Sequence, residues 1–121
     1  MINLTIKRKK IEIVEIANVI TQLFEKVKTK LSADDYLHFY NVRNLCKKLI
    51  DKTFSFYSNR SGSATIKINV NEFESLLRFS ELSKGIILFD PYYSSILSDL
   101  INELDRQRIQ LAHPSNFALP E

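Results

Sequence analysis

The segment 64–83 (ATIKINVNEFESLLRFSELS) changes its apolar period partway along, and this change limits the folds open to the chain. Apolar and polar residues first alternate, the apolar ones being Ala64, Ile66, Ile68 and Val70. A period of two is typical of a strand with one buried face. Apolar residues then follow at helical spacing, and Asn71 and Glu74 are placed as the N-cap and third residue of a helix. The segment therefore predicts a strand that leads directly into a helix.

Residues 4–20 (LTIKRKKIEIVEIANVI) share this organisation at an offset of 60 positions. The identical pairs at that offset are Thr5 and Thr65, Ile6 and Ile66, Lys7 and Lys67, and Glu12 and Glu72. Average composition would give about one identity over this length. Coincidence is the other explanation, because apolar periodicity raises the number of chance matches between amphipathic segments. We expect an internal duplication, with coincidence as the open alternative.

The remaining periodicities complete an order of strand, helix, helix, linker, strand, helix, helix. Helices are expected from about residue 9 to 30, from 33 to about 56, after the strand at 64–70, and from Pro91 to about 111 behind the N-cap Asp90. We therefore predict an α+β fold, predominantly helical, made of two strand–helix–helix units with a small antiparallel sheet. Because two short strands are unstable alone, they must pair with each other or with those of a second subunit.

We expect the two units to form a single domain at 1–111, followed by a tail at 112–121. Repeat 1 spans about 1–57, a Ser- and Gly-containing linker spans 58–63, and repeat 2 spans about 64–111. The tail contains two prolines and little periodicity, which predicts an extended or disordered segment.

Composition favours a cytoplasmic protein. No apolar run approaches the ~20 residues of a membrane span, and the first residues lack the pattern of a signal peptide. The one cysteine, Cys46, excludes an intrachain disulfide and suits a reducing cytosol. The abundance of Ile, Lys, Asn and Ser is typical of an AT-rich bacterial or phage genome. We expect no membrane partner.

The sequence holds few residues of the kinds that catalysis or metal binding requires. His38 and His113 have no partner at metal-ligand or nucleophile spacing, and Cys46 lies on the apolar stripe of the second helix. Two glycines, Gly62 and Gly85, cannot form a Gly-rich phosphate loop. We expect no catalytic site, no metal and no cofactor, and hence a non-catalytic binding or regulatory protein.

Basic residues give the stronger lead to function. Residues 1–60 carry twelve Lys and Arg against six Asp and Glu, whereas residues 61–121 carry five against eight. This asymmetry indicates either a basic binding face or two halves that complement each other. Clusters of this kind neutralise phosphates in nucleic-acid binders. The predicted nucleic-acid-binding residues are Thr5, Lys7, Arg8, Lys9, Lys10, Thr65 and Lys67.

The order of strand, helix and helix, with a polar or basic outer strand face, resembles the layout of ribbon–helix–helix DNA-binding proteins. In those proteins two antiparallel strands enter the major groove and present alternate side chains to base edges. The corresponding outward set here is Asn3, Thr5, Lys7, Thr65, Lys67 and Asn69. A tandem duplication would supply both strands from one chain. The likeness concerns layout, since the first two helices are longer than in that compact unit.

The alternative function is protein–protein interaction, as an adaptor or inhibitor from a phage or other mobile element that binds a host or partner protein. Tyrosine is enriched in interface cores. The predicted protein-binding residues are Tyr36, Tyr40, Tyr92 and Tyr93. The same rings could instead complete the core or its rim. A homodimer, which we also expect, would bury them and could supply further strands.

Overall fold

The computed structural model describes residues 3–54, 62–85 and 90–111. The predicted tail and most of the predicted linker lie outside these residues. Within the described ranges the fold is the predicted one, predominantly helical with a small two-stranded antiparallel sheet. The strands are β1 (Asn3–Lys9) and β2 (Ser63–Asn69), and the helices are α1 (Lys10–Val27), α2 (Tyr36–Phe54), α3 (Val70–Leu82) and α5 (Pro91–Leu111). Two short 3₁₀ helices, η1 (Lys28–Lys30) and η2 (Ala33–Asp35), connect α1 to α2.

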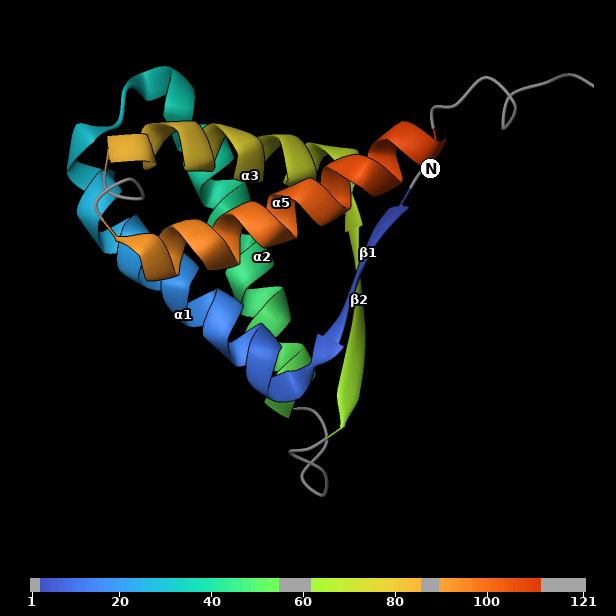
Figure 1. Cartoon of the computed structure of the whole chain (residues 1–121). Coiled ribbons are helices and arrows are strands. Elements are labelled where there is room, and N and C mark those ends of the chain that lie inside the picture. The colour runs from blue at the N-terminus through green and yellow to red at the C-terminus, as the bar shows by residue number, and fades with distance from the viewer. Residues whose placement is uncertain (1–2, 55–61, 86–89, 112–121) are drawn as a thin grey trace, which may run out of the picture.

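The sheet stands along one side of the helices, as Figure 1 shows. Its two strands are antiparallel, with Ile6 opposite Ile66 at the centre and Asn3 opposite Asn69 at one end. β2 begins at Ser63, one residue earlier than predicted. The prediction that the strands pair with each other is confirmed, so the sheet needs no strand from a second subunit.

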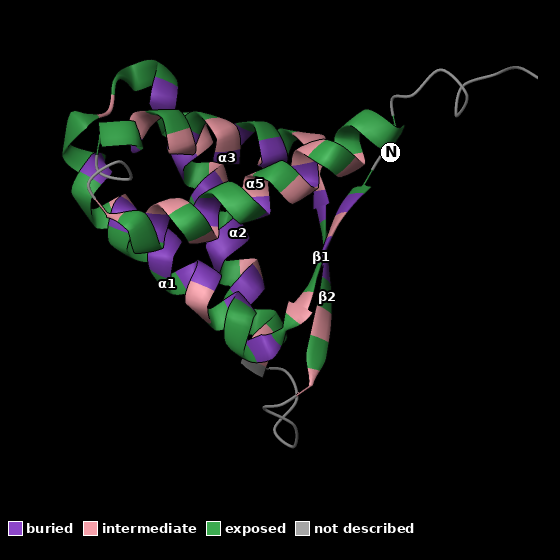
Figure 2. Cartoon of the chain, in the orientation of Figure 1, coloured by how far each residue is buried: buried purple, intermediate pink, exposed green. Residues whose placement is uncertain are grey.

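The core lies between the inner face of the sheet and the helices. Four residues of that face are fully buried, namely Leu4, Ile6, Ile66 and Ile68. Each contributes about 1.5–3 kcal/mol by leaving water. The helices bury most of their regularly spaced apolar residues, with exposed residues on their outer sides (Figure 2). Ile50 on α2 and Leu111 on α5, which the spacing placed on the buried stripes, are instead exposed. The burial of alternate strand residues is the reason why the other face of each strand points outward.

Both strands pass directly into helices, and a glutamate caps each junction. Glu12 accepts a hydrogen bond from the backbone N–H of Lys9 at 3.3 Å, and Glu72 accepts one from that of Asn69 at 3.0 Å. The Asn69 side chain in turn accepts from the N–H of Glu72 at 2.7 Å. The predicted cap at Asn71 and Glu74 is therefore wrong by two residues. The reason is that Ile68 is the last residue the sheet buries, so the chain is free to turn at Asn69.

The two junctions occupy equivalent positions in the two units, since residues 9 and 12 correspond to 69 and 72 at the offset of 60. This correspondence is local, because α1 has 18 residues and α3 has 13. The internal duplication stays a hypothesis.

α5 begins as predicted and brings its C-terminal half to β1. Asp90 accepts a hydrogen bond from the N–H of Tyr92 at 3.0 Å, which confirms it as the cap behind Pro91. The helix then runs across the front of the molecule in Figure 1 and ends beside the N-terminal half of β1. It thereby places Glu103 and Gln107 against the strand.

Among the helices of the described ranges, none is both long enough and apolar enough to cross a membrane.

Candidate nucleic-acid interface

The outward side of the sheet carries only polar residues. We define the ribbon face as six of its positions, namely Asn3, Thr5, Lys7, Thr65, Lys67 and Asn69; the pair Lys9 and Ser63, which ends the sheet on the same side, is not counted in it. The register places Thr5 opposite Lys67 and Lys7 opposite Thr65, on the two rungs either side of the Ile6 and Ile66 rung. The face therefore has two lysines and no acidic residue. The structure thus brings together the outward set that the sequence predicted.

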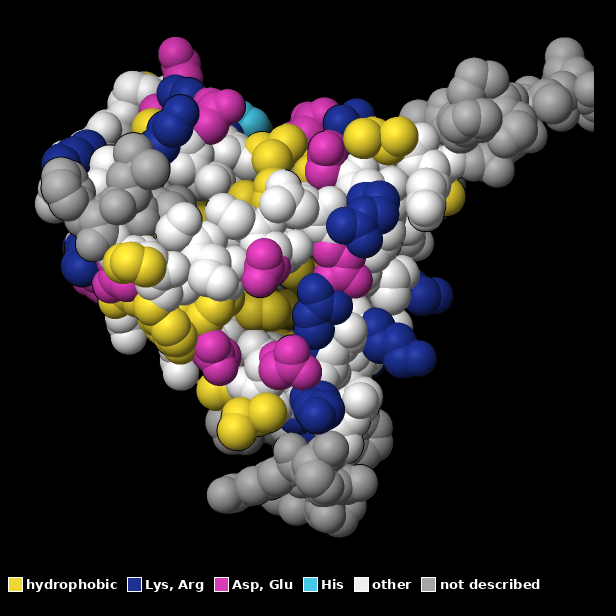
Figure 3. Space-filling view, viewed as in Figure 1, with side chains coloured by type: hydrophobic (Ala, Val, Ile, Leu, Met, Phe, Trp, Pro, Cys, Tyr) yellow, Lys and Arg dark blue, Asp and Glu magenta, His cyan; other side chains and the backbone are white. Residues whose placement is uncertain are grey.

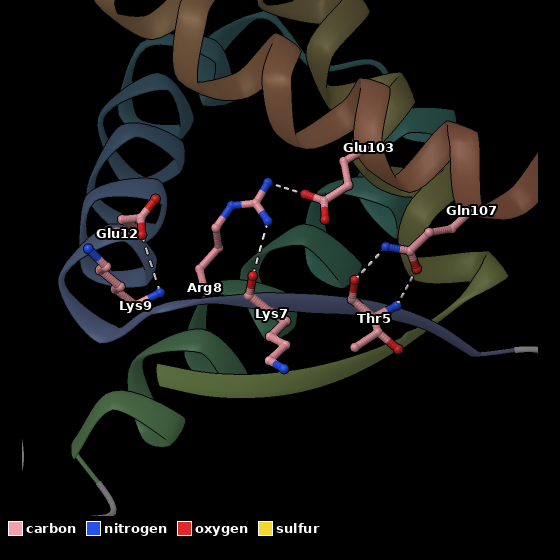
Figure 4. Close-up of polar contacts among 7 residues, drawn as sticks. All are labelled: Thr5, Lys7, Arg8, Lys9, Glu12, Glu103 and Gln107. Atoms are coloured by element: carbon pink, nitrogen blue, oxygen red, sulfur yellow. Dashed lines mark hydrogen bonds and ion pairs between the residues drawn. The ribbon is translucent and has the colours of Figure 1, made fainter. Parts of the chain in front are cut away.

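The ribbon face is open to solvent at its centre. Lys7, Thr65 and Lys67 are exposed, while Thr5 is half-buried. Figure 4 shows the side chains of Thr5 and Lys7 pointing to the same side of β1, away from α5. Dark blue Lys and Arg side chains gather along this side of the molecule in Figure 3. A ligand could approach the four central side chains without displacing a described element.

Side chains from neighbouring helices occupy the two outer edges of the ribbon. In an antiparallel pair, the backbone groups of every second residue point away from the partner strand. The Gln107 amide donates to the Thr5 carbonyl oxygen and accepts from the Thr5 N–H, both at 2.8 Å (Figure 4). On β2 the Lys48 ammonium donates to the Lys67 carbonyl oxygen at 2.7 Å and to the Glu72 carboxylate at 3.1 Å. These contacts fix the ribbon against the helices and block strand addition at Thr5.

Arg8, which the sequence predicted as a nucleic-acid-binding residue, does not lie on the ribbon face. Its side chain turns toward α5, where the guanidinium forms an ion pair with Glu103 (Figure 4). The hydrogen bond with Glu103 raises the pKa of Arg8, although burial acts in the opposite direction. The cause is strand alternation, because Arg8 follows the outward Lys7 and so must point to the other side. The charge of Arg8 is therefore paired within the protein.

Lys9 and Lys10 take different positions. Lys9 ends β1 with an exposed side chain, but Figure 4 shows that side chain beside the first turn of α1 rather than along Lys7. Lys10 begins α1 and is buried, with 7% of its surface exposed. Little of Lys10 is thus open to a ligand, and its contact with nucleic acid stays a prediction. Its backbone N–H donates to the Gly62 carbonyl oxygen at 2.9 Å and so extends the sheet contacts by one position.

Two residues that matter to this site were not predicted. Gln107 and Lys48 hold the edges of the ribbon, yet both lie on helices whose periodicity says only that they face away from the core. Gln107 lies 102 positions from Thr5 along the chain. Only the paired donor and acceptor of a Gln side chain could have suggested an edge cap, and many exposed glutamines share that property.

Three of the four predicted protein-binding tyrosines are exposed. Tyr36, Tyr40 and Tyr92 expose 62%, 59% and 52% of their surface. Tyr93 does not, since it is 9% exposed and its hydroxyl donates to the Gln22 side chain. The Lys26 ammonium also lies 5.4 Å from the centre of the Tyr93 ring. Tyr93 therefore fastens α5 to α1 and is not available to a partner.

A surface cavity of about 580 Å³ lies on the outer side of α2. It is lined by Tyr40, Arg43, Asn44, Cys46, Lys47 and Ile50. Leu37, next to Tyr36 on the same helix, is 67% exposed. This part of α2 combines exposed apolar side chains with two basic ones.

His38 and Cys46 have structural surroundings. The Nδ1 atom of His38 lies 3.0 Å from the Ser75 hydroxyl, which also accepts from the Asn41 amide at 3.0 Å. Ser75 is only 1% exposed, so these contacts connect α2 to α3 inside the protein. Cys46 is a buried thiol, as predicted, and burial raises its pKa.

The described part of the chain contains no group of three or more His, Cys, Asp or Glu side chains placed to hold a metal ion. Comparison with protein-family models, with curated proteins and with solved structures gave no match.

Proposed function

We propose that this protein is a non-catalytic, cytoplasmic binding protein that contacts nucleic acid through the ribbon face. The observation that carries the proposal is the register, which places Thr5, Lys7, Thr65 and Lys67 together on one face of the ribbon, on the rungs either side of Ile6 and Ile66. Lysine ammonium groups bind phosphates and base edges, and threonine hydroxyls can donate to both or accept from bases. A face with those groups and no carboxylate attracts a polyanion.

The setting of the ribbon supports the same function. Its edges are held by Gln107 and Lys48, so its outward side chains stand on a backbone fixed by the helices. A rigid backbone lowers the entropic cost of binding. Lys9 is exposed next to this face and adds positive charge.

The test is a titration of a labelled random-sequence duplex with the full chain at ~50 and ~200 mM salt. Phosphate-driven binding weakens steeply between these concentrations. A double variant, Lys7→Ala with Lys67→Ala, should bind about ten-fold more weakly or worse at low salt. The matched control is Lys30→Ala, which removes an exposed charge beyond the far end of α1, roughly 27 Å of helix away from the sheet. Absence of binding at ~50 mM salt, or equal loss in the control, would refute the proposal.

The second candidate function is binding of a partner protein at α2. The observation that favours it is the group of exposed apolar residues Tyr36, Leu37 and Tyr40, next to the cavity described above. Arg43 and Lys47 line that cavity, so the surface fits an acidic segment with apolar side chains.

A library of displayed random peptides tests this second function. Selected peptides should be rich in Asp, Glu and apolar residues, and should lose binding to a Leu37→Ser, Tyr40→Ser double variant. They should keep binding to the Lys7, Lys67 variant. A second copy of this chain could occupy the same surface in the expected homodimer, and light scattering tests this. A dimer that dissociates in the Leu37→Ser, Tyr40→Ser variant would assign the surface to self-association instead.

A further inference from the structure

The ribbon face has a local two-fold symmetry. The register pairs Ile6 with Ile66, and on either side of this pair Thr5 with Lys67 and Lys7 with Thr65. A half-turn about an axis that passes between Ile6 and Ile66, perpendicular to the sheet, brings the position of Thr5 to that of Thr65 and the position of Lys7 to that of Lys67. Each residue thus falls on one of the same type. Each of the two rungs next to the axis therefore contains one threonine and one lysine, in opposite order.

The symmetry extends to the backbone that supports these side chains. The carbonyl oxygens of Lys7 and Lys67 both accept from a cationic side chain, Arg8 at 3.0 Å and Lys48 at 2.7 Å. Glu12 and Glu72 cap equivalent helix starts at the ends of the two strands. The two lysine carbonyl oxygens and the two helix starts thus have contacts of the same kind in both halves.

We propose that a single chain of this protein recognises a short inverted repeat in double-stranded DNA, with the axis of the repeat facing the Ile6 and Ile66 pair. This inference rests on the proposed function. A two-stranded ribbon fits the major groove of B-form DNA, which is about 12 Å wide. Because the halves of the ribbon face are alike, they offer the same contacts to two DNA half-sites that a half-turn also relates.

Duplex DNA suits this face better than other nucleic acids. Proteins that bind single strands stack bases on aromatic rings, and the six positions of the ribbon face hold none. The major groove of A-form RNA is too deep and narrow for side chains to read. Rungs on one face of a sheet repeat every two residues, about 6.8 Å, which is close to two base-pair steps of B-form DNA.

The side chains indicate what each half-site contains. Lysine binds the O6 and N7 acceptors of guanine, and threonine contacts several bases, including the thymine methyl group. Lys7 and Lys67 lie on different strands and different rungs, so they meet opposite half-sites. The outer positions differ between the halves, since Asn3 corresponds to Ser63 and Lys9 to Asn69. We therefore expect a symmetric core with one guanine per half-site and unlike flanks.

The experiment is selection of bound duplexes from a pool with a randomised centre, using the full chain at low salt. The expected result is an inverted repeat with guanine in each half, bound by one chain per duplex in analytical ultracentrifugation. Lys7→Ala and Lys67→Ala should each reduce discrimination at one half-site by about ten-fold or more and leave the other intact. Lys30→Ala should change neither. The selected sequence should bind less well as single-stranded DNA or as duplex RNA.

The outcomes separate this inference from the proposed function. Binding with no sequence preference, with an asymmetric core, or with two chains per site would overturn the inference and leave nucleic-acid binding in place. Tighter binding to the single strand or to RNA would do the same. No binding to any member of the pool would overturn both.

Discussion

At the scale of single residues, Asn69 has two roles, because it ends β2 and caps α3. Its side chain accepts a hydrogen bond from the N–H of Glu72 at 2.7 Å. We predict that Asn69→Ala lowers the free energy of unfolding by about 1 kcal/mol, the usual cost of losing an N-cap. Urea denaturation measures this. Asn71→Ala is the control, since Asn71 is exposed in the first turn of α3 and should cost much less. Equal losses would show that the helix is not capped at Asn69.

The ion pair of Asp35 with Arg78 predicts a pH dependence of stability. Asp35 is buried at the end of η2, directly before α2, and its carboxylate accepts from Arg78 at 2.9 Å and from the Ser32 hydroxyl at 2.9 Å. The hydrogen bond from Arg78, followed by that from Ser32, lowers the pKa of Asp35 below its ordinary value of 3.8. A lowered pKa in the folded state stabilises the protein above the unfolded-state value, and this contribution is lost as the pH falls through the folded-state value.

Arg78→Met should therefore destabilise the protein at pH 7 and progressively less as the pH falls below about 4. The measurement is the difference in free energy of unfolding between the two proteins at a series of pH values. A difference that stays constant down to pH 2 would show that Arg78 acts by packing rather than through the Asp35 carboxylate.

At the scale of secondary-structure elements, α5 supplies the hydrogen-bond partners for the backbone groups of Thr5 on the outer edge of β1. The Gln107 side chain satisfies both backbone groups of Thr5. We predict that Gln107→Ala lowers the free energy of unfolding by about 1–2 kcal/mol, since two partly buried hydrogen bonds are lost. Hydrogen exchange at the Thr5 amide should become faster in the same variant. Asn102→Ala, an exposed change on the same helix, should alter neither quantity. Unchanged exchange at Thr5 would contradict the edge cap.

The elements could be predicted from the sequence because periodicity reports burial directly. The alternation around Ile66 and Ile68 predicted β2, and Asp90 with Pro91 predicted the start of α5. The end of β2 could not be placed, because Val70 continues the alternation although the sheet no longer buries it. Pattern alone does not say where tertiary contacts stop.

The candidate site was predictable only in part, for a related reason. Alternation places Lys7 outward and Arg8 on the other side, but a run of four basic residues suggested one continuous cluster. That Arg8 is paired depends on Glu103, which lies 95 positions away. The burial of Tyr93 likewise depends on α1. Contacts between distant segments decided which predicted residues are free to bind.

At the scale of the whole molecule, one chain builds a complete ribbon and supports it on both sides. α5 contacts β1 and α2 contacts β2, so the ribbon face is the side of the sheet that the described helices leave open. A basic, polar face on such a support is the physical basis for the proposed contact with DNA. The exposed apolar residues of α2 are the competing surface.

The most direct test of this account is an NMR titration of the isotope-labelled full chain with a short DNA duplex at low salt. The account predicts that backbone signals of Thr5, Lys7, Thr65 and Lys67 shift or broaden first, while those of Tyr36 and Tyr40 stay unchanged. Signals that move only on α2, or a spectrum that does not change at a large excess of DNA, would contradict it.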